Sequence, residues 1–317
     1  MADTDIMILA KDVDYKKMVG KVCYLSEKID GIPGIFDAAN PAALSRGGNH
    51  ILSVPHIHEA VRDIIATTFD PEDEVEPPVI LGELYVPGKP FKDGGGIIRR
   101  QEPQVNEGIK LRIWDAYFPS NMKLGYQARM VKAHPWLQDL ERKYPELVET
   151  SAIHWVVPKS AFHAEKAVLT FFNNLIDVND YKRLPRPEGV IIRTHDEPYK
   201  IGRSWGLMRY VEKPTIDLRV CAFEEATANK TMTFMGETFN KGEGLRAVGK
   251  IFVKYGEDII GVGPGCMTHK ERCDYFNRPE KLVGKIIKIQ YKRDDSYKAL
   301  RQPTFVCIHH DKTTPDK

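Results

Sequence analysis

Residues 27–31 read Glu-Lys-Ile-Asp-Gly, and this short stretch decides how the whole chain is interpreted. A lysine followed by Asp30-Gly31 is by itself typical of a strand that ends in a tight turn. The stretch gains weight because further segments follow it one after another, namely Ser45-Arg46-Gly47-Gly48, Gly82-Glu83-Leu84-Tyr85, Arg112-Ile113-Trp114-Asp115, Glu188-Gly189-Val190-Ile191-Ile192-Arg193 and Tyr199-Lys200-Ile201-Gly202-Arg203-Ser204. Each segment alone is unspecific, and only the ordered series indicates a function.

In this order, the segments resemble the covalent nucleotidyltransferases, the superfamily of DNA ligases, RNA ligases and RNA-capping enzymes. The C-terminal part narrows the resemblance, because Arg301-Gln302-Pro303-Thr304-Phe305 and the later Asp311-Lys312 resemble the closing element of ATP-dependent DNA ligases. The resemblance spans roughly residues 20 to 312 of 317, and this length is similar to that of the compact ligases of bacteriophages and viruses. It implies a role in DNA replication, repair and recombination.

Composition agrees with a two-domain protein of the cytoplasm. A length of 317 residues, 42% of them hydrophobic, is enough for about two domains with separate cores. The five cysteines lack the paired spacing of a zinc site or a disulfide framework, which favours a reducing compartment. The acidic N-terminus is unlike a signal peptide, and no stretch approaches the roughly 18 apolar residues of a membrane span. We expect a cytoplasmic monomer, in the host cell if the protein is viral, with no membrane partner.

Charge is distributed unevenly along the chain, although the net charge is only +2. Residues 241–317 carry 16 Lys and Arg against 10 Asp and Glu, a net +6, and the preceding 240 residues carry −4. Several of these cations, Lys288 among them, alternate with apolar residues of a strand-like run. From charge alone, a solvated strand face and a basic module that follows DNA phosphates are both open.

The pattern of apolar residues predicts an α+β fold with two domains, residues 1–213 and 214–317. In the first, short β-rich runs such as 79–85 are mixed with amphipathic helices expected at 56–69, 136–144 and 161–175. The side chains expected in the core from the last helix are Phe162, Val168, Leu169, Phe172 and Leu175. The acidic, proline-rich residues 70–78 are expected to form a loop.

After Lys213-Pro214 the pattern changes to short strands separated by glycines, including an alternating run at 286–291. Closely spaced strands and turns of this kind are compatible with a small β-barrel. The resemblance supplies the names: an N-terminal adenylyltransferase (nucleotidyltransferase) domain followed by a C-terminal oligonucleotide-binding (OB) fold β-barrel.

Lys28 is the candidate nucleophile, because the resemblance implies a lysyl-AMP intermediate. An amine attacks the α-phosphate of ATP only when unprotonated, so we expect desolvation or nearby positive charge, including a bound metal ion, to lower its pKa. The sequence has no Gly-x-x-x-x-Gly-Lys-Ser/Thr loop, so the phosphates are not held as in P-loop proteins. By the resemblance, Asp30 is a catalytic residue that orders the loop of the nucleophile.

Glu83 and Glu188 are the candidate metal ligands. Both lie in apolar, strand-like runs, where an isolated carboxylate is costly unless it is paired or metal-bound. Their hard oxygen atoms suit Mg²⁺ or Mn²⁺. The resemblance implies that Glu83 contacts the ribose and that Glu188 holds the catalytic metal; for either glutamate alone, a surface position at a strand edge is the alternative.

Trp114 is the candidate for stacking on adenine. It lies 31 positions after Glu83 and matches a family aromatic with this role, whereas a tryptophan in such a run is ordinarily part of a core. Stacking of an aromatic ring on a base contributes about 1–3 kcal/mol. The resemblance implies further ATP-binding roles for Glu27, Arg46, Arg193, Arg209 and Lys213, and contacts with DNA or pyrophosphate for Arg46, Lys288, Arg301 and Lys312.

Three positions depart from the family pattern. Pro33 replaces an arginine. Arg209 takes the first position of the usual Lys-x-Lys element and a valine the second, so Lys213 is expected to act as the second catalytic cation, with Lys200 as the alternative. His309 replaces an arginine of the terminal element, and a partly charged imidazole would bind pyrophosphate less firmly.

The sequence therefore predicts an ATP-dependent DNA ligase that seals nicks between a 3′-hydroxyl and a 5′-phosphate in duplex DNA, with ATP and Mg²⁺ or Mn²⁺ as cofactors. The reaction would pass through lysyl-AMP and DNA-adenylate. An RNA ligase or an RNA-capping nucleotidyltransferase would share Lys28, Glu83 and Glu188 and stays open. An OB-containing DNA-binding protein with a decayed catalytic domain also stays open, because of the three departures.

Overall fold

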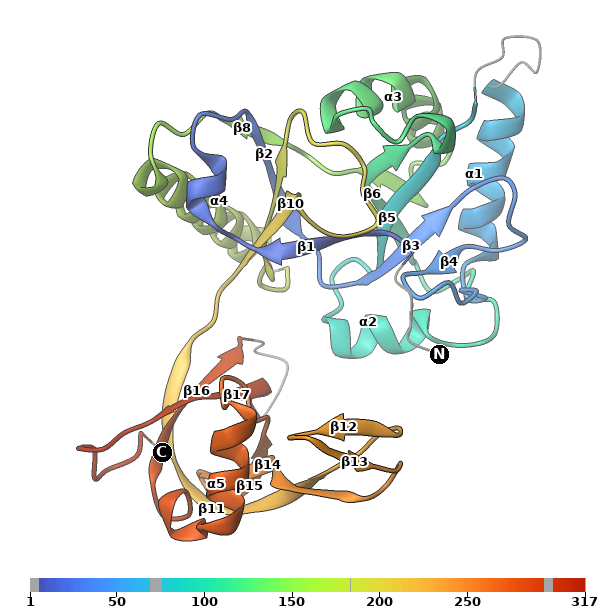
Figure 1. Ribbon diagram of the computed structural model, residues 1–317. Coiled ribbons are helices and arrows are strands. Elements are labelled where there is room, and N and C mark those ends of the chain that lie inside the picture. The colour runs from blue at the N-terminus through green and yellow to red at the C-terminus, as the bar shows by residue number, and fades with distance from the viewer. Residues whose placement is uncertain (1–5, 69–75, 183, 294–298, 317) are drawn as a thin grey trace. The chain divides into compact units, whose positions relative to one another are not determined.

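The computed structural model describes residues 6–68, 76–182, 184–293 and 299–316 of the chain. The chain divides into two compact units, Met1–Val211 and Glu212–Lys317 (Figure 1). Both combine helices with mainly antiparallel sheets, so the α+β class expected from the sequence is confirmed. Among the helices described, none is both long enough and apolar enough to cross a membrane.

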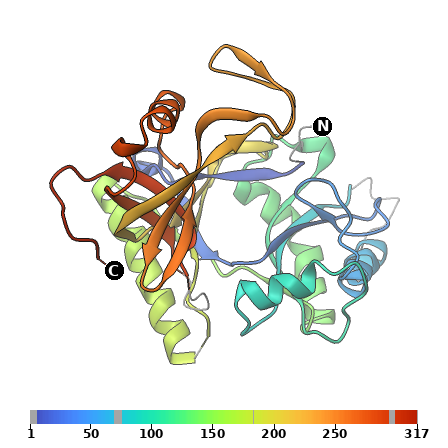
Figure 2. The same ribbon diagram turned by 90° about the horizontal axis from the view of Figure 1, so that it is seen from below.

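The first sheet of the N-terminal unit contains the strand that ends at Lys28. Its strands are, in spatial order, β1 (Ile8–Asp12), β10 (Gly202–Val211), β9 (Gly189–Thr194), β2 (Cys23–Lys28) and β8 (His154–Val156). Cys23 and Leu25 pack on the long helix α4 (Ala161–Lys182), which Figure 2 shows along its length in yellow-green. Because side chains alternate along a strand, Tyr24, Ser26 and Lys28 point to the other face of this sheet.

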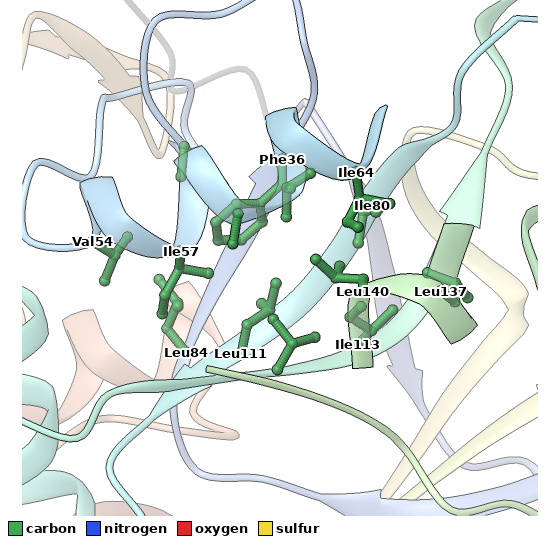
Figure 3. Close-up of a cluster of buried hydrophobic side chains, with 14 of the residues drawn as sticks. Phe36, Val54, Ile57, Ile64, Ile80, Leu84, Leu111, Ile113, Leu137 and Leu140 are labelled. Atoms are coloured by element: carbon green, nitrogen blue, oxygen red, sulfur yellow. The ribbon is translucent and has the colours of Figure 1, made fainter. Parts of the chain in front are cut away.

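The second sheet carries Glu83 in its central strand. Its strands are, in order, β4 (Leu44–Ser45), β3 (Ile32–Phe36), β5 (Val79–Tyr85), β6 (Lys110–Tyr117) and β7 (Val148–Thr150). Two helices, α1 (Pro55–Thr68) and α3 (Tyr126–Lys143), pack on one face through a large apolar core (Figure 3). The short helix α2 (Phe91–Ile98) adds Ile97 and Ile98 to the same core.

The remaining faces of the two sheets share a further core, which places the sheets against each other. Ile8 and Leu207 join it from the first sheet, and Ile35 and Leu81 join it from the second. The N-terminal unit is therefore layered as α4, first sheet, second sheet, and α1 with α3. Since Glu83 follows Leu81 by two positions on β5, its side chain points to the same inner face.

The helices expected from the sequence are present, and two of them extend beyond their predicted bounds. α1 agrees with the expected 56–69, apart from residue 69, which lies outside the described residues. α3 begins ten residues before the expected 136 and continues through Pro135, although a proline inside a helix removes one backbone donor. Of the acidic stretch expected as a loop, residues 70–75 lie outside the described residues, and residues 76–78 have no regular secondary structure.

One side chain expected in the core of α4 is exposed. Val168 and Phe172 are buried together with Ala164, and spacings of four residues place all three on one stripe of the helix. Phe162 is 69% exposed, because two residues before Ala164 correspond to a rotation of about 200° around the helix. Its assignment to the core was wrong.

The C-terminal unit is built on a five-stranded antiparallel sheet. Its strands are, in order, β15 (Asp258–Val262), β14 (Gly244–Tyr255), β11 (Thr215–Thr227), β16 (Ile286–Lys292) and β17 (Arg301–Ile308). The hairpin of β12 (Met232–Phe234) and β13 (Glu237–Phe239) precedes β14, and α5 (His269–Asn277) follows β15. Thr268 and Glu271 form a capping box at the start of α5.

The closed barrel expected for this unit is not confirmed. β15 and β17 are the two edge strands of the sheet, and closure would require them to pair along their length. Among the described residues, these two edges meet at an isolated bridge between Gly263 and Thr304. There, Phe305 N donates to Gly263 O at 2.9 Å, so the sheet curls toward closure without completing a ladder.

We expect Leu111→Ala to lower the free energy of unfolding by about 3 kcal/mol, because Leu111 is fully buried in the core of the second sheet and its truncation leaves a cavity. Val131→Ala is the control, because Val131 on α3 is 60% exposed, and we expect a change below about 0.5 kcal/mol. Urea unfolding followed by circular dichroism measures both; similar values for the two variants would contradict this assignment of the core.

Candidate active site

Lys28 lies at the end of β2, in a row of residues that crosses three strands. Gly189 of β9 is its direct partner, and Val211 of β10 is in turn the partner of Gly189. A Cβ atom on Gly189 would collide with the carbonyl oxygen of Tyr210, so only glycine allows the strands to approach this closely. Val211, the valine in the second position of the Lys-x-Lys element, therefore lies level with Lys28, with Gly189 between them.

The amine of Lys28 is paired with a carboxylate. Its Nζ donates to Glu188 Oε2 at 2.5 Å, and the two side chains are 20% and 7% exposed. Burial alone would lower the pKa of the Lys28 amine, but the carboxylates of Glu188, Glu83 and Asp30 outweigh burial and raise it. The lowered pKa expected from the sequence included the effect of a bound metal ion; the protein residues by themselves raise the pKa of Lys28, because their negative charge outweighs burial.

Glu83, on the second sheet, adds a further carboxylate near Lys28 and Glu188. It lies opposite Pro33 of β3 and Arg112 of β6. Burial raises the pKa of Glu83 to about 7; the Lys28 charge opposes this rise, and the negative charges of Glu188 and Asp30 add to it.

The backbone N–H of Gly31 also bonds to Glu83 and partly opposes the rise in its pKa. A Cβ atom at Gly31 would collide with the carbonyl oxygen of Leu84, so glycine lets the turn after Lys28 lie directly against β5.

Trp114 occupies a β-bulge in β6. The register jumps from Leu81–Asp115 to Gly82–Ile113, so Trp114 is the extra residue of the bulged strand. Its ring is half-buried at the margin of the core between the sheets, and the guanidinium carbon of Arg193 lies 4.7 Å from the ring centroid.

Beside Trp114, the carboxylate of Asp115 is fully buried and shared by two arginines. Arg193 Nη1 donates to Oδ2 at 2.6 Å, and Arg129 donates to both carboxylate oxygens at 2.7 and 2.8 Å. The sequence argument named Arg193 but missed Asp115 and Arg129. A charged residue in the buried stripe of α3 was the available signal for Arg129, because buried charges need partners.

Glu27, expected to bind ATP, contributes to a second ionic contact between the two sheets. Its Oε2 accepts from Arg112 Nη1 at 2.7 Å. Arg112 Nε donates to Glu149, and Arg112 Nη2 donates to Tyr85 Oη at 3.2 Å. Arg112 and Asp115 thus flank Trp114 on β6, and each links that strand to the sheet of the nucleophile.

The other expected cations of the N-terminal unit lie at its surface. Arg209 of β10 is on the same face of its sheet as Val211, and its Nε donates to Asp12 Oδ1 at 2.9 Å. Arg46 is exposed in the turn after β4, where its carbonyl oxygen accepts from Ile6 N at 3.1 Å. Lys200 is exposed just before β10.

The remaining expected cations lie on or next to strands of the C-terminal sheet. Lys213 is exposed shortly before β11, and Arg301 begins β17 opposite Lys292. Lys288 lies on β16 opposite Asp217 of β11.

Asp217 draws together the terminal residues of the C-terminal unit. Lys312 Nζ donates to Asp217 Oδ2 and to Asp316 Oδ1, both at 2.7 Å. His309 Nε2 lies 3.0 Å from Asp217 Oδ1.

Within the four described ranges, no group of three or more His, Cys, Asp or Glu side chains is arranged to hold a metal ion. Glu188 and Glu83 offer carboxylate oxygens, which are hard ligands.

No protein-family model and no curated protein matches the chain. Solved structures do match it over nearly its whole length. A structure named Pmar-Lig_Pre shares 19% sequence identity over 98% of this chain and 68% of its own, with a TM-score of 0.72. A structure from a structure–function analysis of Lig E DNA ligases shares 16% sequence identity over 96% of this chain and 98% of its own, with a TM-score of 0.66. The ATP-dependent DNA ligase of bacteriophage T7 in complex with ATP shares 14% sequence identity over 97% of this chain and 99% of its own, with a TM-score of 0.53.

These similarities concern the fold, because the sequence identities are low. The resemblance to ATP-dependent DNA ligases drawn from the sequence is confirmed at that level, and the chain has the two-domain fold of these neighbours.

We expect Glu83→Gln to gain stability relative to the wild type as the pH rises. The pKa of Glu83 is raised from its ordinary 4.5 to about 7, so the folded state disfavours its charge. Its contribution to stability is full below pH 4.5 and is lost as the pH rises to 7, whereas glutamine does not titrate. The difference should reach at most about 3 kcal/mol and level off above pH 7. Urea unfolding from pH 4.5 to 8 with a metal chelator measures it; exposed Glu102→Gln gives the baseline, and a flat difference would refute the environment assigned to Glu83.

Proposed function

We propose that the protein is an ATP-dependent DNA ligase that seals nicks between a 3′-hydroxyl and a 5′-phosphate in duplex DNA. The observation that carries the proposal is the Lys28–Glu188 pair, which Glu83 approaches from the facing sheet, in a chain with the fold of DNA ligases. A lysine held among carboxylates has a ready proton acceptor, which is what an amine nucleophile needs. ATP as the donor is supported by the fold of the T7 ligase, whose solved structure contains ATP.

In the first step, Lys28 Nζ forms a bond to the α-phosphorus of ATP and the bond to pyrophosphate breaks. The amine must first lose a proton, and Glu188 Oε2, at 2.5 Å from Nζ, is positioned to accept it. The product is lysyl-AMP. The 5′-phosphate of the nick then takes the AMP, and the 3′-hydroxyl finally displaces it to form the phosphodiester.

The carboxylates of Glu188 and Glu83 would hold a Mg²⁺ or Mn²⁺ ion that arrives with ATP. Magnesium in phosphoryl-transfer sites is commonly held by one or two carboxylates plus substrate phosphates, so a cage of three protein ligands is not required. When bound, the ion would supply positive charge against the carboxylates that now raise the pKa of Lys28 and against the charge that develops on the phosphates.

The other site residues are assigned roles in the N-terminal unit, proposed as the adenylyltransferase domain. Trp114 would stack on adenine, Glu83 would contact the ribose, and Asp30 would order the turn after Lys28. Glu27 would support the adenine site through its contact with Arg112. Arg46 would contact the nucleotide or the DNA.

The C-terminal unit is proposed as an OB-fold domain that binds nicked DNA. Lys288, Arg301 and Lys312 would contact DNA phosphates or pyrophosphate, in line with the net +6 of residues 241–317. We propose a cytoplasmic monomer that acts in replication, repair and recombination. An RNA ligase and a capping enzyme would give different products in the experiment below, and a decayed enzyme would give none.

Lys28→Ala should abolish transfer of label from α-labelled ATP to the protein, because the amine that forms the bond is gone. Sealing of a nick whose 5′ end is already adenylylated should persist at a reduced rate. Lys21→Ala, which removes an exposed lysine just before β2, should be labelled like the wild type.

Each possible outcome of this experiment has a distinct meaning. A labelled Lys28→Ala protein would show that another lysine is the nucleophile. Labelling of the wild type by GTP and not ATP would favour a capping enzyme, and sealing of RNA alone would favour an RNA ligase. No labelling of the wild type with Mg²⁺ or Mn²⁺ would favour a decayed catalytic domain.

Arg209→Ala and Lys213→Ala should each slow single-turnover adenylylation at least tenfold, about 1.4 kcal/mol of barrier, without lowering the melting temperature. A fixed positive charge near the α-phosphate lowers the barrier to transfer, and these residues are the candidates for the incomplete Lys-x-Lys element. Lys200→Ala is the matched control, expected to act at the wild-type rate. A slow Lys200→Ala with a normal Lys213→Ala would transfer the role to Lys200.

A further inference from the structure

The ring expected to bind adenine lies at an irregularity in the pairing of its strand. Trp114 is the extra residue of a β-bulge, and the paired residues on either side of the bulge are Asp115 and Ile113. Bulges re-aim a side chain and interrupt the ladder that otherwise fixes its direction. At such a position, side-chain contacts add to the backbone pairing in setting the direction of the Trp114 ring.

Arg193 is in contact with this ring from the opposite sheet. It lies on β9 of the first sheet, whereas Trp114 lies on β6 of the second. Its guanidinium carbon is 4.7 Å from the centroid of Trp114 and 4.9 Å from that of Tyr126. The Arg193 side chain is only 4% exposed, so water screens these cation–π contacts little.

Asp115 keeps the guanidinium of Arg193 in one orientation. Arg193 Nη1 donates to Asp115 Oδ2 at 2.6 Å, and Arg129 occupies both oxygens of the same carboxylate. Arg129 is itself tied to the carbonyl oxygens of Leu124 and Glu197, at 3.2 and 2.9 Å. A planar guanidinium with fixed hydrogen bonds is a rigid surface for an aromatic ring.

We propose that Arg193 is a positioning residue that sets the orientation of the Trp114 ring for stacking on adenine and does not itself bind the phosphates of ATP. The inference rests on the proposed function. It assigns Arg193 a role different from the direct ATP contact expected from its place in the sequence. It also makes the affinity for the nucleobase depend on an ionic contact between the two sheets.

A purely structural ion pair is the competing explanation, and Arg129 makes it testable. Arg129 and Arg193 share the partner Asp115 and are similarly buried, but only Arg193 is found over the ring of Trp114. Arg193→Met and Arg129→Met each remove one buried positive charge from the same carboxylate. Arg193→Lys keeps the charge and removes the planar surface, so it is informative even if Arg193→Met does not fold.

The experiment is single-turnover labelling of the full chain with α-labelled ATP, with thermal melts of every variant. We expect Arg193→Met to raise the half-saturating ATP concentration at least tenfold and to change the rate at saturating ATP less than threefold. Arg193→Lys should show a smaller rise. Arg129→Met should melt earlier and raise the half-saturating ATP concentration clearly less than Arg193→Met does, because Arg193 keeps its own hydrogen bond to Asp115 and its contact with the Trp114 ring. An Arg193→Lys protein with wild-type half-saturation would overturn the proposal.

Two further measurements separate positioning through Trp114 from direct contact with phosphates. Trp114→Ala combined with Arg193→Met, or with Arg193→Lys, should bind ATP no more weakly than Trp114→Ala alone, and additive losses would overturn the proposal. Inorganic pyrophosphate reverses lysyl-AMP formation and carries no base. Its half-saturating concentration should be unchanged in the Arg193 variant, and a rise would show a phosphate contact. If the wild-type protein is not labelled at all, the proposed function fails first and this inference with it.

Discussion

The N-terminal unit depends on one carboxylate that no solvent reaches. Asp115 is 0% exposed and joins a strand of the second sheet to a strand of the first and to α3, through Arg193 and Arg129. A buried charge is tolerated only with full pairing, and loss of one partner typically costs about 3–5 kcal/mol. The other contacts between the two sheets include the Glu27–Arg112 ion pair and an apolar core, whose contacts are strong but not directional. The ion pairs therefore fix how the facing sheets are aligned, and the candidate active site lies between these two sheets.

The charges around Lys28 are not balanced, in contrast to those around Asp115. Around one amine lie the carboxylates of Glu188, Glu83 and Asp30, so negative charge exceeds positive charge there. Burial, with the negative charges of Glu188 and Asp30 adding to it, raises the pKa of Glu83 to about 7, and the excess of negative charge is costly unless cations arrive with the substrate. The same residues that hold the lysine in place thus make the site selective for a ligand that brings positive charge with it.

Local patterns in the sequence indicated the strands, and the resemblance of the ordered segments named the charged residues of the candidate site. Lys28, Glu83 and Glu188 lie in β-rich runs whose alternation is visible, and the structure brings them together. The sequence could not show that carboxylates would outweigh burial at Lys28, because that balance depends on distances across two sheets. Arg129 could have been suspected from its place in the buried stripe of α3, but its partner Asp115 lies on another element and could not be named from the sequence.

The remaining differences from the sequence interpretation also have physical causes. Phe162 belongs to an apolar run, but helical periodicity turns it away from Ala164 and the core. Strand-like spacing predicted the elements of the C-terminal sheet, whereas closure depends on how its two edges meet, which spacing alone does not encode. The bulge at Trp114 leaves no local mark either, since it arises from the register between two strands.

The C-terminal residues illustrate how an internal ion pair changes the value of a surface charge. Lys312 shares its amine between Asp217 and Asp316. Asp217 N donates to the carboxylate of Asp316, and Asp316 N donates to the carbonyl oxygen of Asp217, so the chain end is fastened along β11. A phosphate that bound Lys312 would have to displace the carboxylates of Asp217 and Asp316. The free energy gained would then be the difference between the new ion pair with phosphate and the ion pairs that are lost. Because Lys312 already has its counterions within the protein, binding there would release fewer ions from the nucleic acid interface than a free lysine would. Salt would weaken the pairs with the aspartates and the pair with phosphate alike. Lys312 would therefore help to orient the bound nucleic acid more than it would make binding depend on ionic strength.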